Sequence, residues 1–204
     1  MGKPQPQYYI AFPKAGNGLS ELLIAGYQRI LENDFWGLTN ASEENRWMML
    51  YYGQEGLHLD GHSRGSMTIG NAMESIAKMS GAEGTLSNTT VSFFGPAYNA
   101  AKADRILGLL QDRSAIVDAG QRREMILTLQ NHIADPVGRF IGLNPATGGT
   151  IPEGATTFGQ MIRAFLGKPD TSHNCYGKPS SPACGNFWRD YTNKMPVSTP
   201  VNKE

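Results

Sequence analysis

The sequence predicts an α/β fold, a sandwich in which a mainly parallel central sheet is flanked by helices. Short runs of apolar, aromatic or β-branched residues alternate along the chain with longer segments whose apolar residues recur every three or four positions. Strands separated by helices pair in parallel, because a parallel pair needs a long crossover connection. The chain has 204 residues, of which 40% are hydrophobic, so it is long enough for one domain with a substantial core.

The first part of the chain holds two predicted strands and three predicted helices. Aromatic and apolar residues predict a strand at 8–12, and a turn-rich loop leads to a helix at 19–31 with leucines on one face. A second helix is predicted at 42–52. A short strand at 56–60 then leads into a third helix at 66–78, whose apolar stripe has helical spacing.

The second part continues the alternation. A β-rich run predicts a strand at 89–94, and a helix is predicted at 97–111. The apolar segment 124–129 is compatible with strand or helix. Residues 143–154 are rich in glycine and proline and are expected to be irregular. One amphipathic helix is predicted within 158–166.

The domain boundaries follow from composition. Residues 1–7 are polar and proline-rich, which indicates a polar leader or an expression remnant rather than a signal peptide. A single α/β domain is expected at 8–195, and 196–204 is expected to form a flexible tail. No run approaches the roughly 18 apolar residues that a transmembrane helix needs.

Charge and cysteine content limit the classes of function. Eighteen basic residues balance eighteen acidic ones, so no global field favours a nucleic acid or an anionic lipid. The two cysteines, Cys175 and Cys184, either form a disulfide in an oxidising compartment or remain free thiols. Together with His173 they lack the spacing of a usual zinc site, so no metal or other cofactor is predicted.

A G-x-S-x-G sequence at 61–65 is the motif around which the chain is organised. It is the pattern of a nucleophile elbow, in which a serine occupies a tight turn between a strand and a helix. Here a predicted strand precedes Ser63 and a predicted helix follows it, in the required order. The alternative is a plain structural turn. The flanking segments favour an α/β-hydrolase-like arrangement with Ser63 as nucleophile.

The rest of a Ser-Asp-His triad is found in the chain order that such folds use. Asp135 ends an apolar run and precedes Pro136 in a predicted loop, so it is the candidate acid, although an Asp-Pro pair also forms ordinary turns. His173 follows all the other elements and is the candidate base. Cys175 and Tyr176 are expected to anchor its loop.

Backbone N–H groups are needed to stabilise an oxyanion. The residue after the nucleophile, Arg64, is expected to supply one. The other is expected from a glycine-containing loop after the first predicted strand, which alternatively only turns the chain. The candidates in that loop are Lys14, Ala15, Gly16 and Asn17.

The other histidines have structural interpretations. His58 is expected to lie within the sheet, and His62 is expected to shape the elbow. His132, near Asp135 in sequence, is a weak alternative base.

Several segments resemble the C-terminal region of filamentous-haemagglutinin-type exoproteins, which include the contact-dependent growth inhibition proteins of Gram-negative bacteria. They are Ser-Glu-Leu-Leu-Ile-Ala-Gly-Tyr-Gln at 20–28, residues 56–71, Phe-Phe-Gly-Pro at 93–96, Asp-Pro-Val at 135–137, and His-Asn-Cys-Tyr-Gly at 173–177 with Cys184 and Trp188. The resemblance implies a large secreted stalk with a variable C-terminal toxin, and a neighbouring immunity protein. The Val-Glu-Asn-Asn segment with which the toxin module usually begins is absent from this sequence.

Three functions are therefore weighed. The first is a secreted bacterial toxin domain that acts in or on a target cell as a serine hydrolase (lipase, phospholipase or esterase). The second is a non-catalytic hydrolase-like module for delivery or for binding an immunity protein. The third is a nuclease toxin that uses His132 and His173. A hydrolase requires Ser63, Asp135 and His173 to converge within hydrogen-bond reach.

Overall fold

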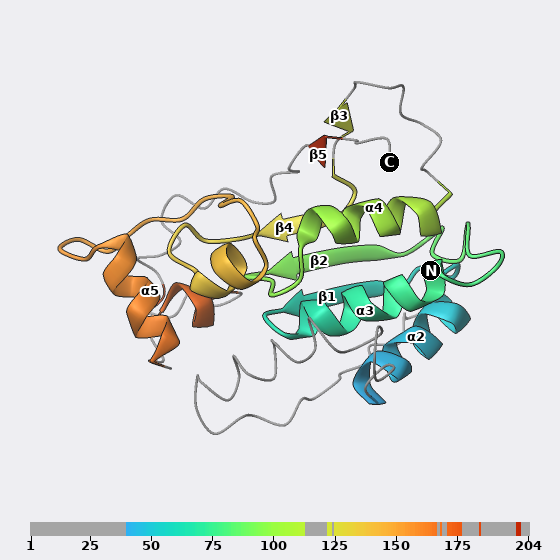
Figure 1. The fold of residues 1–204 in the computed structure, drawn as a ribbon, viewed down its shortest axis with the longest axis horizontal. Coiled ribbons are helices and arrows are strands. Elements are labelled where there is room, and N and C mark those ends of the chain that lie inside the picture. Colours follow the sequence, from blue (N-terminus) through green and yellow to red (C-terminus); the bar gives the residue numbers. More distant parts are fainter. Residues whose placement is uncertain are drawn as a thin grey trace, which may run out of the picture.

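A computed structural model describes residues 40–112, 122–123, 125–166, 168, 171–176, 184 and 199–200 (Figure 1). The predicted strand at 8–12 and the predicted helix at 19–31 lie outside the described residues, as does the tail expected at 196–204 apart from residues 199–200, which lie in a short strand. No described helix is long and apolar enough to cross a membrane.

The centre of the fold is a three-stranded parallel sheet with the order β1-β2-β4. Its strands are β1 (His58–His62), β2 (Thr90–Phe94) and β4 (Thr128–Gln130). Leu59 pairs with Val91, and Phe93 pairs with Leu129. The predicted alternation of parallel strands and helices is confirmed at this level. Two short strands, β3 (Arg122–Arg123) and β5 (Thr199–Pro200), form a separate antiparallel pair.

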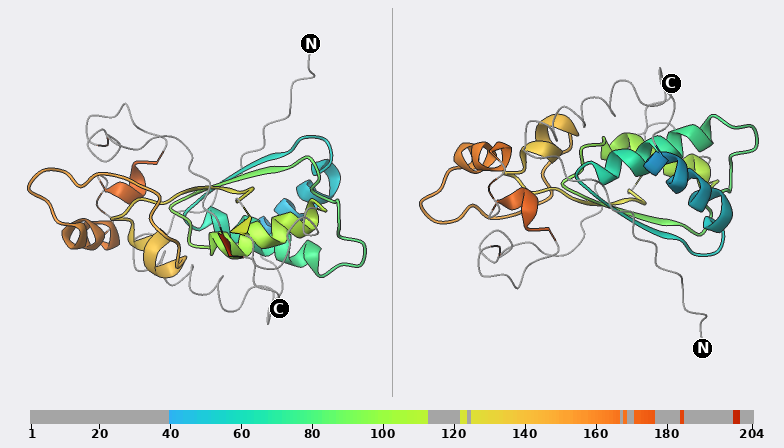
Figure 2. Two further views of the ribbon diagram at one scale, coloured as in Figure 1. Left: turned by 90° about the horizontal axis from the view of Figure 1, so that it is seen from above. Right: turned by 90° about the horizontal axis from the view of Figure 1, so that it is seen from below.

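The helices α2 (Asn40–Tyr52), α3 (Gly65–Ala77) and α4 (Ala100–Leu110) cover one face of the sheet, as Figure 2 shows. Helix α4 begins at an N-cap, Asn99, whose side chain accepts a hydrogen bond from the Lys102 N–H. This bond satisfies one of the backbone donors that a helix start leaves without a partner.

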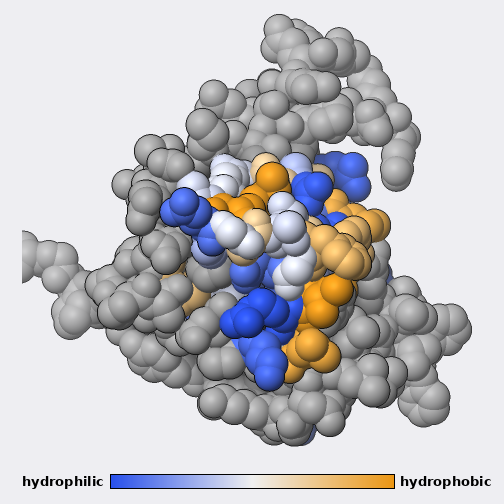
Figure 3. Space-filling model, turned by 90° about the vertical axis from the view of Figure 1, so that its left-hand side faces the viewer, coloured by the Kyte–Doolittle hydropathy of each residue, from blue (hydrophilic) through white to orange (hydrophobic). Residues whose placement is uncertain are grey.

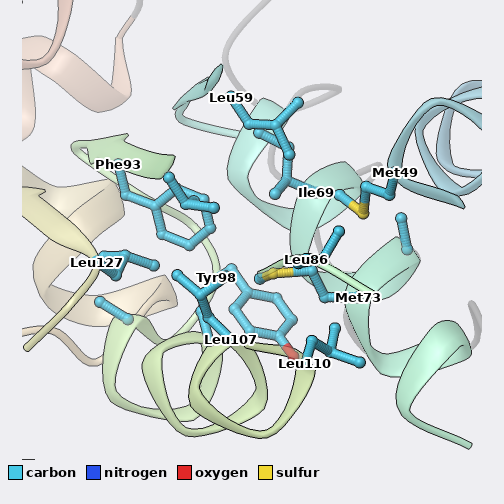
Figure 4. Packing of buried hydrophobic residues seen from close by; sticks show 14 of the residues in the cluster. Met49, Leu59, Ile69, Met73, Leu86, Phe93, Tyr98, Leu107, Leu110 and Leu127 are labelled. Atoms are coloured by element: carbon cyan, nitrogen blue, oxygen red, sulfur yellow. The ribbon is translucent and has the colours of Figure 1, made fainter. Parts of the chain in front are cut away.

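The core lies between the sheet and these helices (Figure 4). Met49 of α2, Met73 of α3, Phe93 of β2 and Leu107 of α4 are all fully buried. Full burial of such a side chain contributes about 1.5–3 kcal/mol through the hydrophobic effect. Leu59 of β1 is buried in the same core, which therefore fixes both the strand and the helix that flank the serine turn, β1 and α3.

The bounds of strands β1 and β4 differ from the predicted segments for physical reasons. Strand β1 starts at His58 instead of residue 56, because Gly56 has a φ of +105° and belongs to the preceding turn. The strand ends at His62, directly before Ser63. The ambiguous segment 124–129 becomes strand only from Thr128.

The loop predicted after Asp135 was wrong in part, since Val137–Ile141 form a five-residue π-helical turn, η2. Pro136 stands at its N-cap, where a proline's missing N–H costs nothing. The structure thus uses Pro136 to start a helical turn instead of ending one.

Beyond the carboxyl ends of the three strands lie η2, the helix α5 (Thr157–Phe165) and the short 3₁₀ helix η3 (Ser172–Asn174) (Figure 1). Hydrophobic side chains at this end of the molecule remain exposed, including Phe158 at 71% and Leu166 at 68%. In Figure 3, which faces this end, hydrophobic and hydrophilic described residues lie side by side.

Candidate active site

Ser63 lies in a strained turn directly after β1. Its φ is +52°, in the left-handed region that non-glycine residues rarely adopt. The Ser63 N–H donates to the Phe94 carbonyl (3.1 Å), and the Ser63 carbonyl accepts from the Ser66 hydroxyl (2.6 Å) and the Ala97 N–H (3.2 Å). These bonds, from β2, from α3 and from the segment between β2 and α4, hold the strained conformation, as is typical of residues whose strain has a functional role.

Gly61 explains why the motif begins with glycine. A Cβ at this position would lie 2.9 Å from the Ser66 Cα and 3.0 Å from the Phe93 ring. The strand and the first turn of α3 therefore approach too closely for any side chain. The predicted order of strand, turn and helix around Ser63 is the one that the structure has.

Asp135 lies in the segment after β4 and is fully buried. Its Oδ1 accepts hydrogen bonds from the N–H groups of Val137 (2.8 Å) and Gly138 (3.2 Å) at the start of η2. Burial raises the pKa of Asp135, but the charge of His173 and the hydrogen bonds from His173, Tyr176 and Gly138 outweigh it, so this pKa lies below its usual value. The carboxyl group is therefore ionised near neutral pH.

His173, in η3, connects the serine with the carboxylate. Its Nδ1 lies 2.9 Å from Oδ2 and 3.0 Å from Oδ1 of Asp135, and its Nε2 lies 3.0 Å from the Ser63 Oγ. An ionised carboxylate only accepts hydrogen bonds, so Nδ1 carries the proton and Nε2 is left to accept from the hydroxyl. All three residues of the predicted triad thus lie in one hydrogen-bonded chain.

The carboxyl ends of the parallel strands bring two of these residues together. Ser63 follows β1 and Asp135 follows β4, while the end of β2 at Phe94 lies between them. Ligands and reacting groups of open parallel sheets gather at this edge. The third residue, His173, reaches the same edge on η3, which contacts α5.

Tyr176 is a site residue that sequence reasoning placed only as a loop anchor. Its hydroxyl donates to the Asp135 Oδ2 (2.8 Å) and accepts from the His132 N–H (2.7 Å). Gly95 makes room for this contact, because a Cβ there would lie 2.6 Å from the Tyr176 ring. No sequence motif marks Tyr176 as a partner of Asp135, or Gly95 as the residue that makes room for its ring. The signal in the sequence was the position of Tyr176, three residues after the candidate base.

The other three histidines have separate roles. His62 is exposed, and its Nε2–H donates to the His173 carbonyl (2.9 Å), so it supports the loop of the base as well as the elbow. His58 is exposed and pairs with Asp60 across 3.1 Å.

His132 is fully buried. Its Nδ1 accepts from the Ala134 N–H (3.0 Å), which leaves Nε2 as the donor to the Thr150 carbonyl (3.1 Å). Both ring nitrogens are thus engaged within the protein. This placement gives no support to His132 as a base.

Cys175 and Cys184 form a disulfide. Cys175 is fully buried and lies two residues after His173, so the covalent bond restrains the end of the loop that carries the base. A structural disulfide persists in an oxidising compartment rather than in a reducing cytoplasm.

The predicted oxyanion donors are only partly described. Arg64 is the N-cap residue of α3, so its backbone lies at the positive end of the helix dipole, beside Ser63. Lys14, Ala15, Gly16 and Asn17 lie outside the described residues. Within the described part of the chain, no group of three or more histidine, cysteine, aspartate or glutamate side chains could hold a metal ion.

The described fold and site define an α/β protein with a Ser-His-Asp chain at the carboxyl edge of its sheet. Compared with known proteins, the chain matches no family model, no curated protein and no solved structure. The resemblance to filamentous-haemagglutinin-type exoproteins therefore stays a prediction.

Proposed function

We propose that this protein is a serine hydrolase that cleaves carboxylic esters. The observation that carries the proposal is the position of His173, whose two ring nitrogens lie 2.9 Å from the Asp135 carboxylate and 3.0 Å from the Ser63 hydroxyl. Such distances are those of a nucleophile, a general base and the group that orients the base.

The reaction follows from these contacts. The Ser63 Oγ attacks the ester carbonyl carbon while its proton passes to the His173 Nε2. The Arg64 N–H stabilises the oxyanion, and the second donor, predicted from the 14–17 loop, lies outside the described residues. Collapse of the tetrahedral intermediate expels the alcohol, which takes the proton from Nε2. Water, deprotonated by the same nitrogen, then attacks the acyl carbon; the bond to the Ser63 Oγ breaks, Oγ regains its proton from Nε2, and the acid is released.

Asp135 stays ionised throughout this cycle. Its lowered pKa keeps the carboxylate available to stabilise the imidazolium that forms when His173 gains a proton. The N–H groups of Val137 and Gly138 keep Oδ1 in place during this step.

A lipid or another ester with an apolar acyl chain is the proposed substrate class. Six large hydrophobic side chains between residues 133 and 166, the segment that also carries Asp135, are exposed to solvent. An acyl chain bound there would remove apolar surface from water. These exposed residues are Ile133, Phe140, Leu143, Phe158, Ile162 and Leu166.

The biological setting is proposed to be a secreted or cell-surface bacterial toxin, part of a larger exoprotein, with a cognate immunity protein. The resemblance noted in the sequence suggests this setting. The disulfide between Cys175 and Cys184 supports it, because the bond favours a protein that works outside a reducing cytoplasm.

The direct test is labelling of the purified protein with a fluorophosphonate probe, which reacts with activated serines. The parent should be labelled, and Ser63→Ala and His173→Ala should abolish labelling. Ser87→Ala is the matched control, because Ser87 is exposed in a loop at the other end of β2. A folded parent that stays unlabelled and hydrolyses no ester would contradict the proposal and leave the non-catalytic binding module.

A further inference from the structure

The hydroxyl of Tyr176 has a fixed direction. A phenol has one proton to donate, and its oxygen can also accept. Because this oxygen accepts the His132 N–H at 2.7 Å, its own proton is directed to the Asp135 Oδ2 at 2.8 Å. The hydroxyl therefore joins the segment after β4 to the loop of His173 at two points.

This contact completes the restraint of the Asp135 carboxylate. Oδ1 accepts from the N–H groups of Val137 and Gly138, and Oδ2 accepts from Tyr176. With both oxygens held from other directions, the plane of the carboxylate is fixed toward the His173 Nδ1. Among the described residues, the base would be the remaining partner of Oδ2 without Tyr176.

The Tyr176 ring is also surrounded by residues of the site. Its centroid lies 5.6 Å from that of His62 and 6.4 Å from that of His173, with the latter pair edge to face. The Phe94 ring, at the end of β2, is 6.5 Å away. The ring thus packs between the elbow and the base, and Cys175 fixes its backbone from the preceding position.

We propose that Tyr176 is a positioning residue for catalysis, which holds the Asp135 carboxylate in the orientation that His173 needs as a base. The inference rests on the proposed serine hydrolase function and adds a fourth residue to its machinery. Its hydroxyl bonds to the Asp135 carboxylate and to the His132 N–H, so the effect of the hydroxyl on the base passes through Asp135.

Tyr176→Phe tests the role of the hydroxyl, since it removes one oxygen and keeps the ring. Tyr98→Phe is the matched control: the Tyr98 hydroxyl also donates to a carboxylate, that of Glu74, within the interface of α3 and α4. For a soluble ester, Tyr176→Phe should lower kcat about 10- to 100-fold, the factor expected for a lost hydrogen bond to a charged group, with little change in KM. Tyr98→Phe should leave kcat within about twofold.

A double-mutant cycle separates positioning from a general effect on the fold. In an Asp135→Asn background, Tyr176→Phe should cost less than threefold, because the carboxylate on which it acts is gone. An equal loss in both backgrounds, or parent-like kcat in Tyr176→Phe, would overturn the proposal.

A second readout needs neither a variant nor activity. In proton NMR spectra of the unaltered protein, the Tyr176 hydroxyl proton and the His173 Nδ1–H both point at the Asp135 carboxylate, so a cross-peak should connect them. Its absence, with the Nδ1–H resonance visible, would contradict the assigned geometry. If the parent hydrolyses no ester but shows the cross-peak, the geometry stands and the proposed function is the part that fails.

Discussion

Gly95 and Asp135 lie so close that a methyl group could not fit between them. A Cβ at Gly95 would lie 2.2 Å from the Asp135 Oδ2, the oxygen that also contacts His173 and Tyr176. Because Gly95, the residue after β2, has no side chain, the Asp135 carboxylate has room to lie where it contacts His173. Gly95 has a φ of +49°, so glycine is favoured there by backbone conformation as well.

Gly95→Ala should therefore displace Asp135 and reduce probe labelling at least 10-fold. Gly84→Ala is the matched control, because Gly84 has a φ of +76° but no atom within 4 Å of the place that a Cβ would take. Both variants carry the backbone strain of about 1–2 kcal/mol. Gly95→Ala also carries the clash with Asp135 and Tyr176, so it should lose labelling and more thermal stability, whereas Gly84→Ala should keep its labelling. Equal labelling of the two variants would show that the contact has no role in the site.

Ser63→Gly should separate activity from stability. Glycine adopts a φ of +52° without the strain that serine bears, so the free energy of unfolding should rise by up to about 1 kcal/mol while labelling disappears. Ser63→Ala should lose labelling as well but retain the strain. Urea unfolding of the three proteins gives the comparison. A Ser63→Gly protein less stable than Ser63→Ala would argue against strain at the elbow.

The lowered pKa of Asp135 predicts an acid-dependent loss of stability. Its folded pKa lies below the unfolded value of about 3.9, so its ionised form stabilises the fold fully above that pH. The contribution is lost as the pH falls through the folded pKa. Urea unfolding of the parent and of Asp135→Asn should show a stability difference at pH 7 that shrinks below about pH 4. A difference independent of pH would contradict the assigned ionisation.

Reduction of the disulfide between Cys175 and Cys184 should weaken both the fold and the site. The bond closes a loop between residues nine apart, and its loss should cost about 2–3 kcal/mol in the chain-entropy description. Labelling should slow because His173 lies two residues from Cys175. Dithiothreitol should have this effect on the parent and none on the Cys175→Ser, Cys184→Ser double variant. Undiminished labelling after complete reduction would show that the loop holds without the bond.

The serine turn could be predicted because its signals are local. The glycine at 61 and the apolar stripe after Ser66 reflect a close strand–helix contact that the structure contains. Asp135 and His173 were selected by their order along the chain, which a parallel sheet converts into proximity at one edge. These three residues could therefore be selected without knowledge of any side-chain contact.

The remaining parts of the site depend on contacts between distant segments. The two hydrogen bonds of Tyr176 span 41 and 44 residues, and no periodicity or turn rule marks such a pair. The helical turn η2 after Pro136 could not be predicted either. Its first N–H groups, those of Val137 and Gly138, donate to the Asp135 side chain, and the sequence does not show this arrangement. The same Asp-Pro sequence without that arrangement would be an ordinary turn.

The hydrogen bond between Ser63 and His173 joins residues 110 positions apart. Contacts of such sequence separation form late, because a long loop must close before they are gained. During synthesis the elbow and its helix leave the ribosome well before the segment that completes the relay. A nascent or truncated chain that stops before residue 173 therefore carries the nucleophile without its base, and on the proposed function such a chain is not a working hydrolase.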